Sequence, residues 1–243
     1  MAGAAKVIVF GGNGFVGTKV LQALCGRSAV AAVSVSRSGS KPKHLENEAW
    51  ASKVQWEKGD AMKPETFQNL LEGTTAVVVS IGSPPIPADE AWQTMMNGDS
   101  NCSVINAAAA AGVPRLVLVN ATTPAWCPSG YAKGKAMAAK CAEEFVGGEA
   151  SRGALVVKPG AIYGTRHTAG GIPIPLAPLL APVRFGLNLA PSLVSAATKA
   201  VPYLLEGALV PPVSVEALAE LAADGCLSGE YGGNLTVKTA LEL

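Results

Sequence analysis

Apolar and polar positions along this 243-residue chain follow two alternating patterns. Short, mostly apolar runs predict strands buried on both faces, and the longer stretches between them have the mixed pattern of covering helices. The expected strands span residues 7–10, 30–36, 54–56, 76–81, 114–120 and 154–158. The expected helices span residues 18–24, 64–71, 89–111 and 129–145, with caps at Asp89 and Ser129. This alternation predicts an α/β fold with a doubly wound parallel sheet, whose ligands bind at the carboxyl ends of the strands.

Glycines interrupt the chain between the first strand and the first helix. The spacing Gly11-x-x-Gly14-x-x-Gly17 in this position predicts a cradle for the pyrophosphate of a dinucleotide. Gly11 permits a tight turn, Gly14 lets the backbone approach the anion, and Gly17 lets the helix pack closely on its strand. The free N–H groups and the positive end of the helix then face the pyrophosphate. We assign to this cradle Gly11, Asn13, Gly14, Phe15, Val16 and Gly17.

The turn after the second strand predicts which dinucleotide is bound. A site for NAD usually offers an acidic residue there to the ribose 2′-hydroxyl, and none stands between positions 31 and 45. Arg37 instead follows Gly17 by 20 residues, and a guanidinium there suits a 2′-phosphate, with the Ser36 hydroxyl beside it. We therefore expect NADP(H), with NAD as the alternative.

Two further turns are candidates for cofactor contacts. Asp60 and Ala61 follow the third strand, where a carboxylate can accept a hydrogen bond from the adenine amino group, although Gly-Asp is also an ordinary turn. The fourth strand ends in Ser80, Ile81 and Gly82, and small residues there let the backbone approach the cofactor.

A tyrosine and a lysine stand four residues apart at the start of the helix that follows the fifth strand. Tyr131 and Lys135 share one face of that helix. A nearby ammonium favours the phenolate, so we expect the pKa of the tyrosine to fall below its usual value of about 10. Such a tyrosine exchanges a proton with a carbonyl or alcohol while the cofactor moves hydride, and the lysine can also bind the cofactor ribose.

The last third of the chain has a different texture. Residues 165–212 are rich in proline, leucine, alanine and valine and hold few charges, and no window gives about 18 uninterrupted apolar residues, so no membrane span is expected. We expect a small irregular lobe over the cofactor site, within one NAD(P)-binding domain of residues 1–243. A helix over 213–221, capped by Ser214, and an edge strand at 235–237 follow.

Composition narrows the function class. The hydrophobic fraction of 49% argues against disorder, and a net charge of +1 gives no electrostatic case for nucleic-acid binding. Five scattered cysteines without a CxxC pair, and only two histidines, predict free thiols in a reducing compartment and no metal site. No signal or transit peptide is visible ahead of the first strand.

Five segments together carry a family resemblance. They are GGNGFVG at 11–17, VSVSRSG at 33–39, NGDSN at 97–101, YAKGK at 131–135 and VKPGAIYG at 157–164. A later PPVSVEAL at 211–218 also fits, so the likeness spans nearly the whole chain. On these segments the chain resembles the atypical or extended short-chain dehydrogenases/reductases. Within them it is similar to an NAD(P)-binding branch of chloroplasts and mitochondria. That branch includes the auxiliary coenzyme Q biosynthesis protein of fungal mitochondria, plant plastid homologues and, more distantly, the reductase-like subunit of complex I.

The resemblance implies a Rossmann fold that binds NADP(H), with Tyr131 and Lys135 as the active pair. It also implies that Pro159, Gly160 and Ile162 lie beside the nicotinamide, and that the protein works in a chloroplast or mitochondrion, with the cytoplasm as the alternative. Active members usually have a serine about a dozen residues before the tyrosine. Leu118 and Val119 stand at that spacing here, so Thr122 or Thr123 is the candidate hydroxyl, and we assign Thr122 to the catalytic set.

Three functions remain open at this stage. The first is an NADP-dependent oxidoreductase acting on a small lipophilic carbonyl or quinone-like substrate. The second is a weakly catalytic or non-catalytic NADPH-binding subunit or assembly factor of an organellar membrane complex, which the departure at the serine favours. The third is a nucleotide-sugar epimerase, against which the lobe counts because it is poor in basic residues for a diphosphate.

Overall fold

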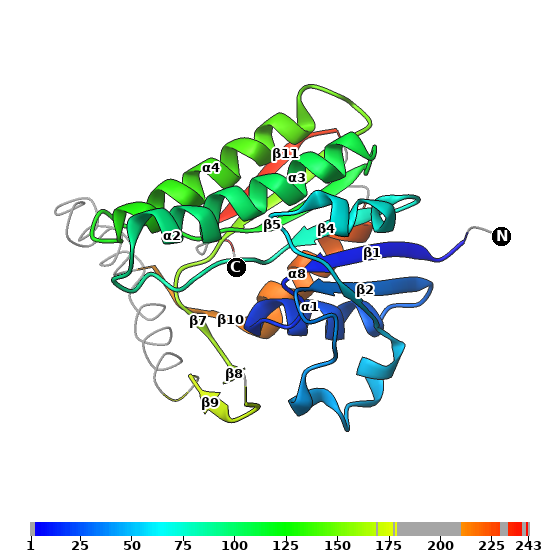
Figure 1. Ribbon diagram of the computed structural model, residues 1–243, viewed down its shortest axis with the longest axis horizontal. Helices are drawn as coiled ribbons and strands as arrows, with labels where there is room; N and C mark the ends of the chain where they lie inside the picture. The colour runs from blue at the N-terminus through cyan, green and yellow to red at the C-terminus, as the bar shows by residue number, and fades with distance from the viewer. Residues whose placement is uncertain are drawn as a thin grey trace.

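The computed structural model describes residues 3–168, 170–176, 178, 210–228, 233–239 and 242. Among these residues, seven strands form one parallel sheet (Figure 1). Their order is β11-β6-β5-β4-β1-β2-β3. The bounds are β1 Ala5–Phe10, β2 Val30–Ser36, β3 Gln55–Lys58, β4 Ala76–Val79, β5 Arg115–Val119, β6 Gly153–Lys158 and β11 Leu235–Thr239. The predicted doubly wound α/β sheet is therefore confirmed, and all six strands expected in the first two thirds of the chain are present.

The helices lie on both faces of this sheet. Their bounds are α1 Phe15–Cys25, α2 Glu90–Thr94, α3 Ser100–Ala110, α4 Ser129–Val146 and α8 Val215–Leu227. Asp89 caps α2 by accepting a hydrogen bond from the Trp92 N–H at 2.7 Å, and Ser214 caps α8 by accepting one from the Ala217 N–H at 3.1 Å. Both predicted caps are confirmed, whereas Ser129 is the first residue of α4 and Pro128 stands at its cap position.

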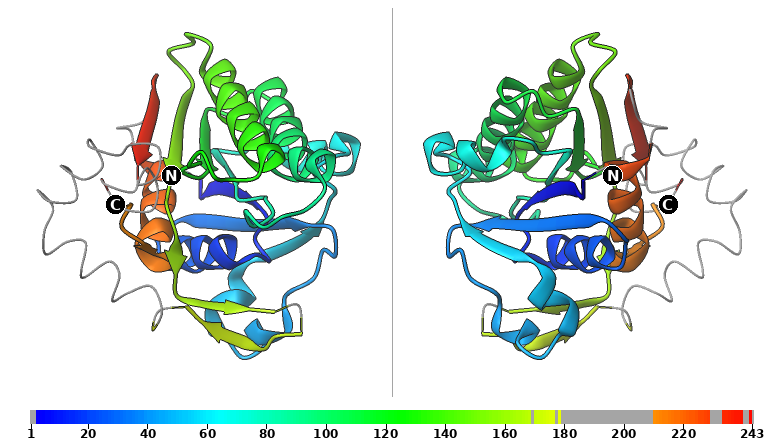
Figure 2. Two further views of the ribbon diagram at one scale, coloured as in Figure 1. Left: turned by 90° about the vertical axis from the view of Figure 1, so that its left-hand side faces the viewer. Right: turned by 90° about the vertical axis from the view of Figure 1, so that its right-hand side faces the viewer.

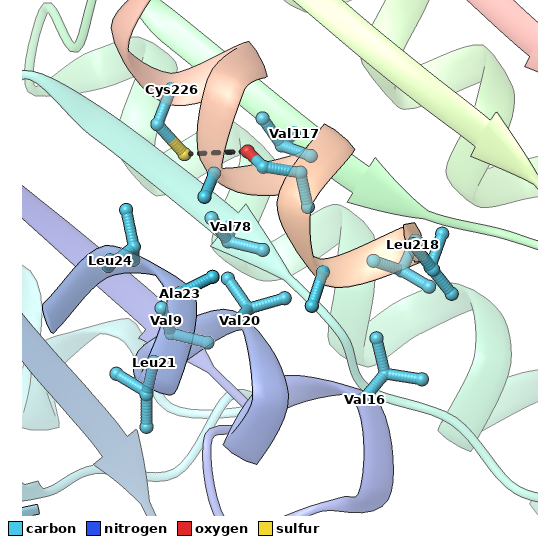
Figure 3. Packing of buried hydrophobic residues seen from close by; sticks show 14 of the residues in the cluster. Val9, Val16, Val20, Leu21, Ala23, Leu24, Val78, Val117, Leu218 and Cys226 are labelled. Atoms are coloured by element: carbon cyan, nitrogen blue, oxygen red, sulfur yellow. Dashed lines mark hydrogen bonds between the residues drawn. The ribbon is translucent and has the colours of Figure 1, made fainter. Parts of the chain in front are cut away.

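Each face of the sheet has its own apolar core, because successive residues of a strand point to opposite sides. Val7 and Val9 of β1 pack with α1 and α8, while Ile8 and Phe10 pack on the side of α3 and α4. Figure 2 shows the two helix layers with the sheet between them, and Figure 3 shows the packing of α1 against α8. This arrangement fixes α1, and with it the glycine turn, against the centre of the sheet.

The helix expected over 213–221 begins later, at Val215, and runs to Leu227. Two other predicted helices are interrupted in the structure. Residues 64–71 form two short 3₁₀ helices, Pro64–Thr66 and Gln68–Leu71, because Phe67 leaves the helical region at φ −142° and buries its ring against Phe10. The long helix expected over 89–111 begins and ends as predicted, but a π-helical turn, Met95–Asp99, separates α2 from α3. Such turns re-aim the side chains that follow them and are frequent at functional sites.

The expectation of free thiols throughout is wrong for one pair of cysteines. Cys102 of α3 and Cys141 of α4, which are 39 positions apart in sequence, form a disulfide, and their Cα atoms are 5.6 Å apart. Packing of α3 against α4 brings the two side chains together, and spacing along the chain gave no sign of it. Cys25, Cys127 and Cys226 are free thiols.

The chain after β6 leaves the sheet in short extended pieces. Strands β7 (Ile162–Tyr163) and β10 (Val213–Ser214) form a parallel pair. Strands β8 (Thr165–His167) and β9 (Pro173–Pro175) form an antiparallel pair. Most of the lobe expected over 165–212 lies outside the described residues, so its place over the cofactor site and the single-domain assignment stay predictions. Among the described residues no helix is long and apolar enough to cross a membrane.

Candidate functional site

The centre of the site is where the order of the strands reverses, between β1 and β4. The chain continues from β1 to α1 on one face and from β4 towards α2 and α3 on the other, which opens a crevice at the carboxyl ends of these strands. Gly11 crosses this point at φ +83°, and a Cβ there would lie 2.4 Å from the Ser80 carbonyl oxygen. Only glycine fits this crossing without displacing the end of β4.

The glycine turn forms the cradle that its spacing predicts. A Cβ on Gly17 would lie 2.2 Å from the Gly11 carbonyl oxygen, so the first turn of α1 presses directly on the turn before it. Gly14 stands at the cap position of α1, where no side chain caps the helix, and the first turn contains no acidic residue. The N–H groups at this helix start are therefore available to an anion such as a pyrophosphate, and the residues fit a dinucleotide.

A cavity of about 590 Å³ opens at the carboxyl ends of the strands, within the usual range of sites for small molecules and cofactors. Twelve of the predicted site residues line it: Gly14, Phe15, Val16, Ser80, Ile81, Gly82, Thr122, Tyr131, Lys135, Pro159, Gly160 and Ile162. Seven others lie outside its lining: Gly11, Asn13, Gly17, Ser36, Arg37, Asp60 and Ala61. The tertiary structure thus brings together residues from positions 14 to 162 in one hollow.

Tyr131 and Lys135 stand at the inner wall of this cavity, on the first turns of α4. Each is only 7% exposed, and the Lys135 Nζ lies 5.8 Å from the centre of the Tyr131 ring. A Cβ on Gly82 would lie 3.3 Å from the same Nζ, so the small residue after β4 leaves room for the ammonium. Among the described residues Nζ has no hydrogen-bond acceptor, and it is free to bind a hydroxyl of a ligand.

The expected fall in the pKa of Tyr131 is wrong. Burial raises the pKa of Tyr131 to about 12, and the nearby Cys127 thiol adds to the rise. Burial also lowers the pKa of Lys135 to about 8. Loss of water on burial is the main cause of both shifts, so at neutral pH Tyr131 is a protonated phenol and Lys135 is mostly charged.

The buried charge on Lys135 costs stability, which gives a test. Replacing Lys135 by methionine is expected to raise the free energy of unfolding at pH 7 by up to about 3 kcal/mol. Because the pKa of Lys135 in the folded protein lies below its unfolded value of 10.5, the cost is complete below about pH 8 and fades as the pH rises. Urea unfolding should show that the gain in free energy of unfolding of Lys135→Met over the wild type is smaller at pH 9 than at pH 7, by about 1 kcal/mol.

Lys140→Met is the matched control, because Lys140 lies on the same helix with its side chain 76% exposed. Its effect should stay within about 0.5 kcal/mol at both pH values. A Lys135→Met protein that is no more stable than the wild type at pH 7 would contradict the assigned cost of the buried charge.

Two asparagines that sequence reasoning did not assign to the site hold its walls. Asn120, at the end of β5, donates to the Lys135 carbonyl at 3.0 Å and lines the cavity, while its buried Oδ1 has no partner among the described atoms. Asn97, in the π-helical turn, accepts from the Ser83 N–H at 3.1 Å and donates to the Ser83 hydroxyl at 2.8 Å. The resemblance of residues 97–101 was the sole sign of Asn97 in the sequence.

Thr122, the candidate for the missing serine, lines the cavity but is already engaged. Its hydroxyl donates to the Lys158 carbonyl at 3.1 Å, and its N–H donates to the Pro159 carbonyl at 2.8 Å. The hydroxyl hydrogen therefore ties the loop after β5 to the end of β6, and only the oxygen lone pairs remain for a ligand.

The residues predicted for the adenosine end form a polar rim beside the glycine turn. Asn13 donates to the Ser40 carbonyl at 3.0 Å, and the Ser36 hydroxyl accepts from the Gly39 N–H at 3.2 Å. Arg37 is exposed and has no ion-pair partner in the described part of the chain. Asp60 accepts from the Met62 N–H at 3.0 Å, which holds its own turn and leaves its second carboxylate oxygen for a ligand.

Comparison with known proteins agrees with this geometry. Residues 11–140 match a family described as NAD(P)H-binding. The uncharacterized chloroplastic protein At1g32220 of Arabidopsis thaliana is 35% identical over 175 residues, which cover 70% of this chain and 55% of the relative. MIOREX complex component 2 of Saccharomyces cerevisiae is 44% identical over 79 residues, 32% of this chain and 28% of that protein. The chain thus spans about half the length of the plant relative and less of the yeast one.

A solved structure has the same fold. WbmH of Bordetella bronchiseptica, in complex with NAD⁺, superposes with a TM-score of 0.62 at 18% sequence identity, over 96% of this chain and 75% of that one. At this identity the likeness establishes the arrangement of strands and helices alone. The glycine cradle lies where the strand order reverses, and the family match covers residues 11–140. Both observations indicate that the chain binds a dinucleotide. The chain therefore belongs to the NAD(P)H-binding family, with a Rossmann fold of the kind found in atypical short-chain dehydrogenases/reductases.

Proposed function

We propose that this protein is an NADP(H)-dependent oxidoreductase that acts on a lipophilic carbonyl or quinone-like substrate through Tyr131 and Lys135. The observation that carries the proposal is the lining of one cavity. The buried tyrosine and lysine share it with Gly14 at the pyrophosphate cradle and with Ile162 beyond the end of β6. A proton donor, a cation and a dinucleotide cradle in one hollow are the parts that carbonyl reduction needs.

The chemistry follows from the protonation states of the pair. When bound, a nicotinamide supplies hydride to the substrate carbon. Tyr131 is a phenol at neutral pH because burial holds its pKa at about 12, so it can donate its proton to the carbonyl oxygen. Lys135 carries most of its charge at pH 7, and its ammonium near the ring stabilises the phenolate that remains. The same ammonium is available to orient a ribose hydroxyl.

The substrate side of the cavity favours an apolar molecule. Prolines and large apolar side chains form this part of the wall: Pro84, Pro85, Pro124, Trp126 and Leu176. Trp126 is 62% exposed, which is unusual for a tryptophan and leaves its ring free to stack on a flat ligand. A quinone or an aryl or alkyl ketone fits such a surface better than a sugar does.

The test of the proposal is NADPH oxidation by the purified protein against a panel of carbonyl compounds. The panel contains alkyl ketones, aryl ketones and benzoquinones with short isoprenoid tails, and the Tyr131→Phe protein gives the background rate for each. The proposal predicts at least one compound that is reduced faster by the wild type. Equal rates for the two proteins across the whole panel would contradict it.

Arg37 is the proposed determinant of NADP(H). Its exposed guanidinium has no ion-pair partner among the described residues, and the Ser36 hydroxyl and the Asn13 amide lie in the polar rim around the same turn. A 2′-phosphate would accept charge-assisted hydrogen bonds from this arginine, whereas a 2′-hydroxyl has no charge to gain from it.

Arg37→Gln should weaken NADPH binding by about ten- to a hundredfold, the value of lost hydrogen bonds to a charged group, and leave NADH binding unchanged. Isothermal titration with both dinucleotides measures this. Lys63→Gln, which removes an exposed cation from the turn after β3, is the control and should alter neither affinity. Equal weakening for both dinucleotides, or for neither, would contradict the role of Arg37.

A second function is favoured by one specific observation. The Thr122 hydroxyl hydrogen is donated to the Lys158 carbonyl, so it is not available to a substrate oxygen in the way that the serine of active relatives is. With the similarity to MIOREX complex component 2, this supports a non-catalytic NADPH-binding subunit or assembly factor of an organellar complex, in a mitochondrion or chloroplast. Native mass measurement of the protein from its source distinguishes a free enzyme from a subunit.

A further inference from the structure

Strand β8 passes the start of α1 with its side chains alternating between two hollows. Thr165 and His167 line a small cavity of about 150 Å³ together with Asn13 and Lys19 on the outer side of the glycine turn. Arg166, between them, lines the large cavity with Gly14. This is the period of two that a strand imposes, and it aims the guanidinium into the cleft that contains the pyrophosphate cradle.

The path of β8 is held on several sides. Arg166 lies opposite Ile174 in the antiparallel pair β8–β9. The turn before β8 packs tightly, because a Cβ on Gly164 would lie 2.5 Å from a Val215 side-chain carbon and 3.4 Å from the tip of the Phe15 ring. His167 stacks on His44 from the loop after β2, with ring centres 4.1 Å apart. These contacts fix the backbone that carries Arg166 beside the first residue of α1.

The charges around the cavity leave one cation without a role. The described residues that line it include two cations, Lys135 and Arg166, and no carboxylate. Lys135 is buried, with its Nζ near the ring of Tyr131. Arg166 is exposed and has no ion-pair partner among the described residues. Lys19, the one cation on α1, lies 3.6 Å from the carboxylate of Glu216 instead of facing the cleft.

We propose that Arg166 is a pyrophosphate anchor, whose guanidinium binds the dinucleotide together with the start of α1. The helix start offers N–H groups but no full positive charge, and a pyrophosphate carries two negative charges. An arginine can meet two of its oxygens at once, with charge-assisted hydrogen bonds that are shorter and stronger than neutral ones. The proposal rests on the dinucleotide binding of the family and is independent of whether the protein turns over a substrate.

The set of ligands whose binding weakens distinguishes the role of Arg166 from that of Arg37. Both NADH and NADPH contain the pyrophosphate, so loss of Arg166 weakens both alike, whereas loss of Arg37 weakens NADPH alone. ADP-ribose keeps the pyrophosphate and lacks the nicotinamide, so its binding also depends on Arg166. AMP lacks the pyrophosphate linkage, and its binding does not.

The experiment is isothermal titration of the wild type, Arg166→Gln and Arg166→Lys with NADH, NADPH, ADP-ribose and AMP. Arg166→Gln should bind the first three ligands about ten- to a hundredfold more weakly and AMP within about twofold of the wild type. Arg166→Lys, which keeps the charge but loses the paired contact, should fall between the two. Lys63→Gln controls for net charge, and thermal unfolding without ligand should give the same midpoint for all variants.

Three outcomes would overturn the proposal. Unchanged affinity of Arg166→Gln for NADH and ADP-ribose would show that the guanidinium does not meet the pyrophosphate, and an altered KM for substrate alone would assign it to the substrate side of the cavity. Weakening of NADPH alone would place it at the 2′-phosphate. Equal weakening of AMP would indicate general damage to the nucleotide site. A wild type that reduces no substrate, with the affinities as expected, leaves the anchor intact while the oxidoreductase proposal fails.

Discussion

Tyr131→Phe should lower kcat for carbonyl reduction by a factor of about 10² to 10⁴, the usual contribution of a positioned proton donor. The change removes one oxygen atom and keeps the ring that packs in the cavity wall near the Lys135 ammonium. NADPH binding should therefore remain within about twofold of the wild type, since the expected cofactor contacts come from the glycine turn and from Lys135. Steady-state kinetics and titration of the same preparation measure the two quantities together.

Tyr163→Phe is the matched control for this experiment. Tyr163 ends β7 one residue after Ile162, and it is not among the residues that line the cavity. Its loss of a hydroxyl should leave turnover unchanged. If Tyr131→Phe turned over at the wild-type rate, another group would supply the proton, and the catalytic role of the pair would have to be abandoned.

Gly17→Ala is expected to lower dinucleotide affinity by more than a hundredfold, because the added methyl group would push the first turn of α1 away from the glycine turn. The added Cβ would stand 2.2 Å from the Gly11 carbonyl oxygen and 2.9 Å from the Gly12 Cα, both backbone atoms that cannot rotate away. Overpacking of this kind costs about 1 to 3 kcal/mol of stability, although alanine is otherwise the better helix residue. Urea unfolding and NADPH titration measure the two losses.

Gly26→Ala tests whether any added methyl group on α1 has this effect. Gly26 follows the last turn of the same helix at φ −77°, and its nearest atom to an added Cβ is the Ala23 carbonyl oxygen at an ordinary 3.4 Å. This variant should keep both stability and affinity. A Gly17→Ala protein that bound NADPH as tightly as Gly26→Ala would exclude close contact of helix and turn as the basis of the cradle.

Much of the sheet and part of the site could be predicted because they depend on local rules. Val30–Ser36 is a strand with the predicted bounds, since its apolar run is closed by residues typical of turns at both ends. Asp89 and Ser214 cap their helices through their own side chains, which needs only a few neighbouring residues. The glycine spacing specified the cradle because steric limits on a backbone turn belong to each residue itself.

Other features depend on partners far away in the chain. Phe67 interrupts the helix expected over 64–71 because its ring meets Phe10, and a pattern within that segment does not contain this contact. The pKa of Tyr131 rises because the fold buries its side chain and removes it from water. The four-residue spacing between Tyr131 and Lys135 gives no information about this burial. The disulfide between Cys102 and Cys141 likewise needed the packing of two helices.

The sequence by itself determined the doubly wound sheet, the cradle at Gly11 to Gly17 and the alignment of Tyr131 with Lys135, because backbone sterics and side-chain periodicity act over a few residues. Only the tertiary structure decided which of the predicted residues share a cavity. It also decided that the Thr122 hydroxyl is committed to Lys158, and that Arg166 faces the same cleft as Gly14. Those decisions rest on contacts across the carboxyl ends of separate strands, where burial and charge are set by neighbours that are distant along the chain.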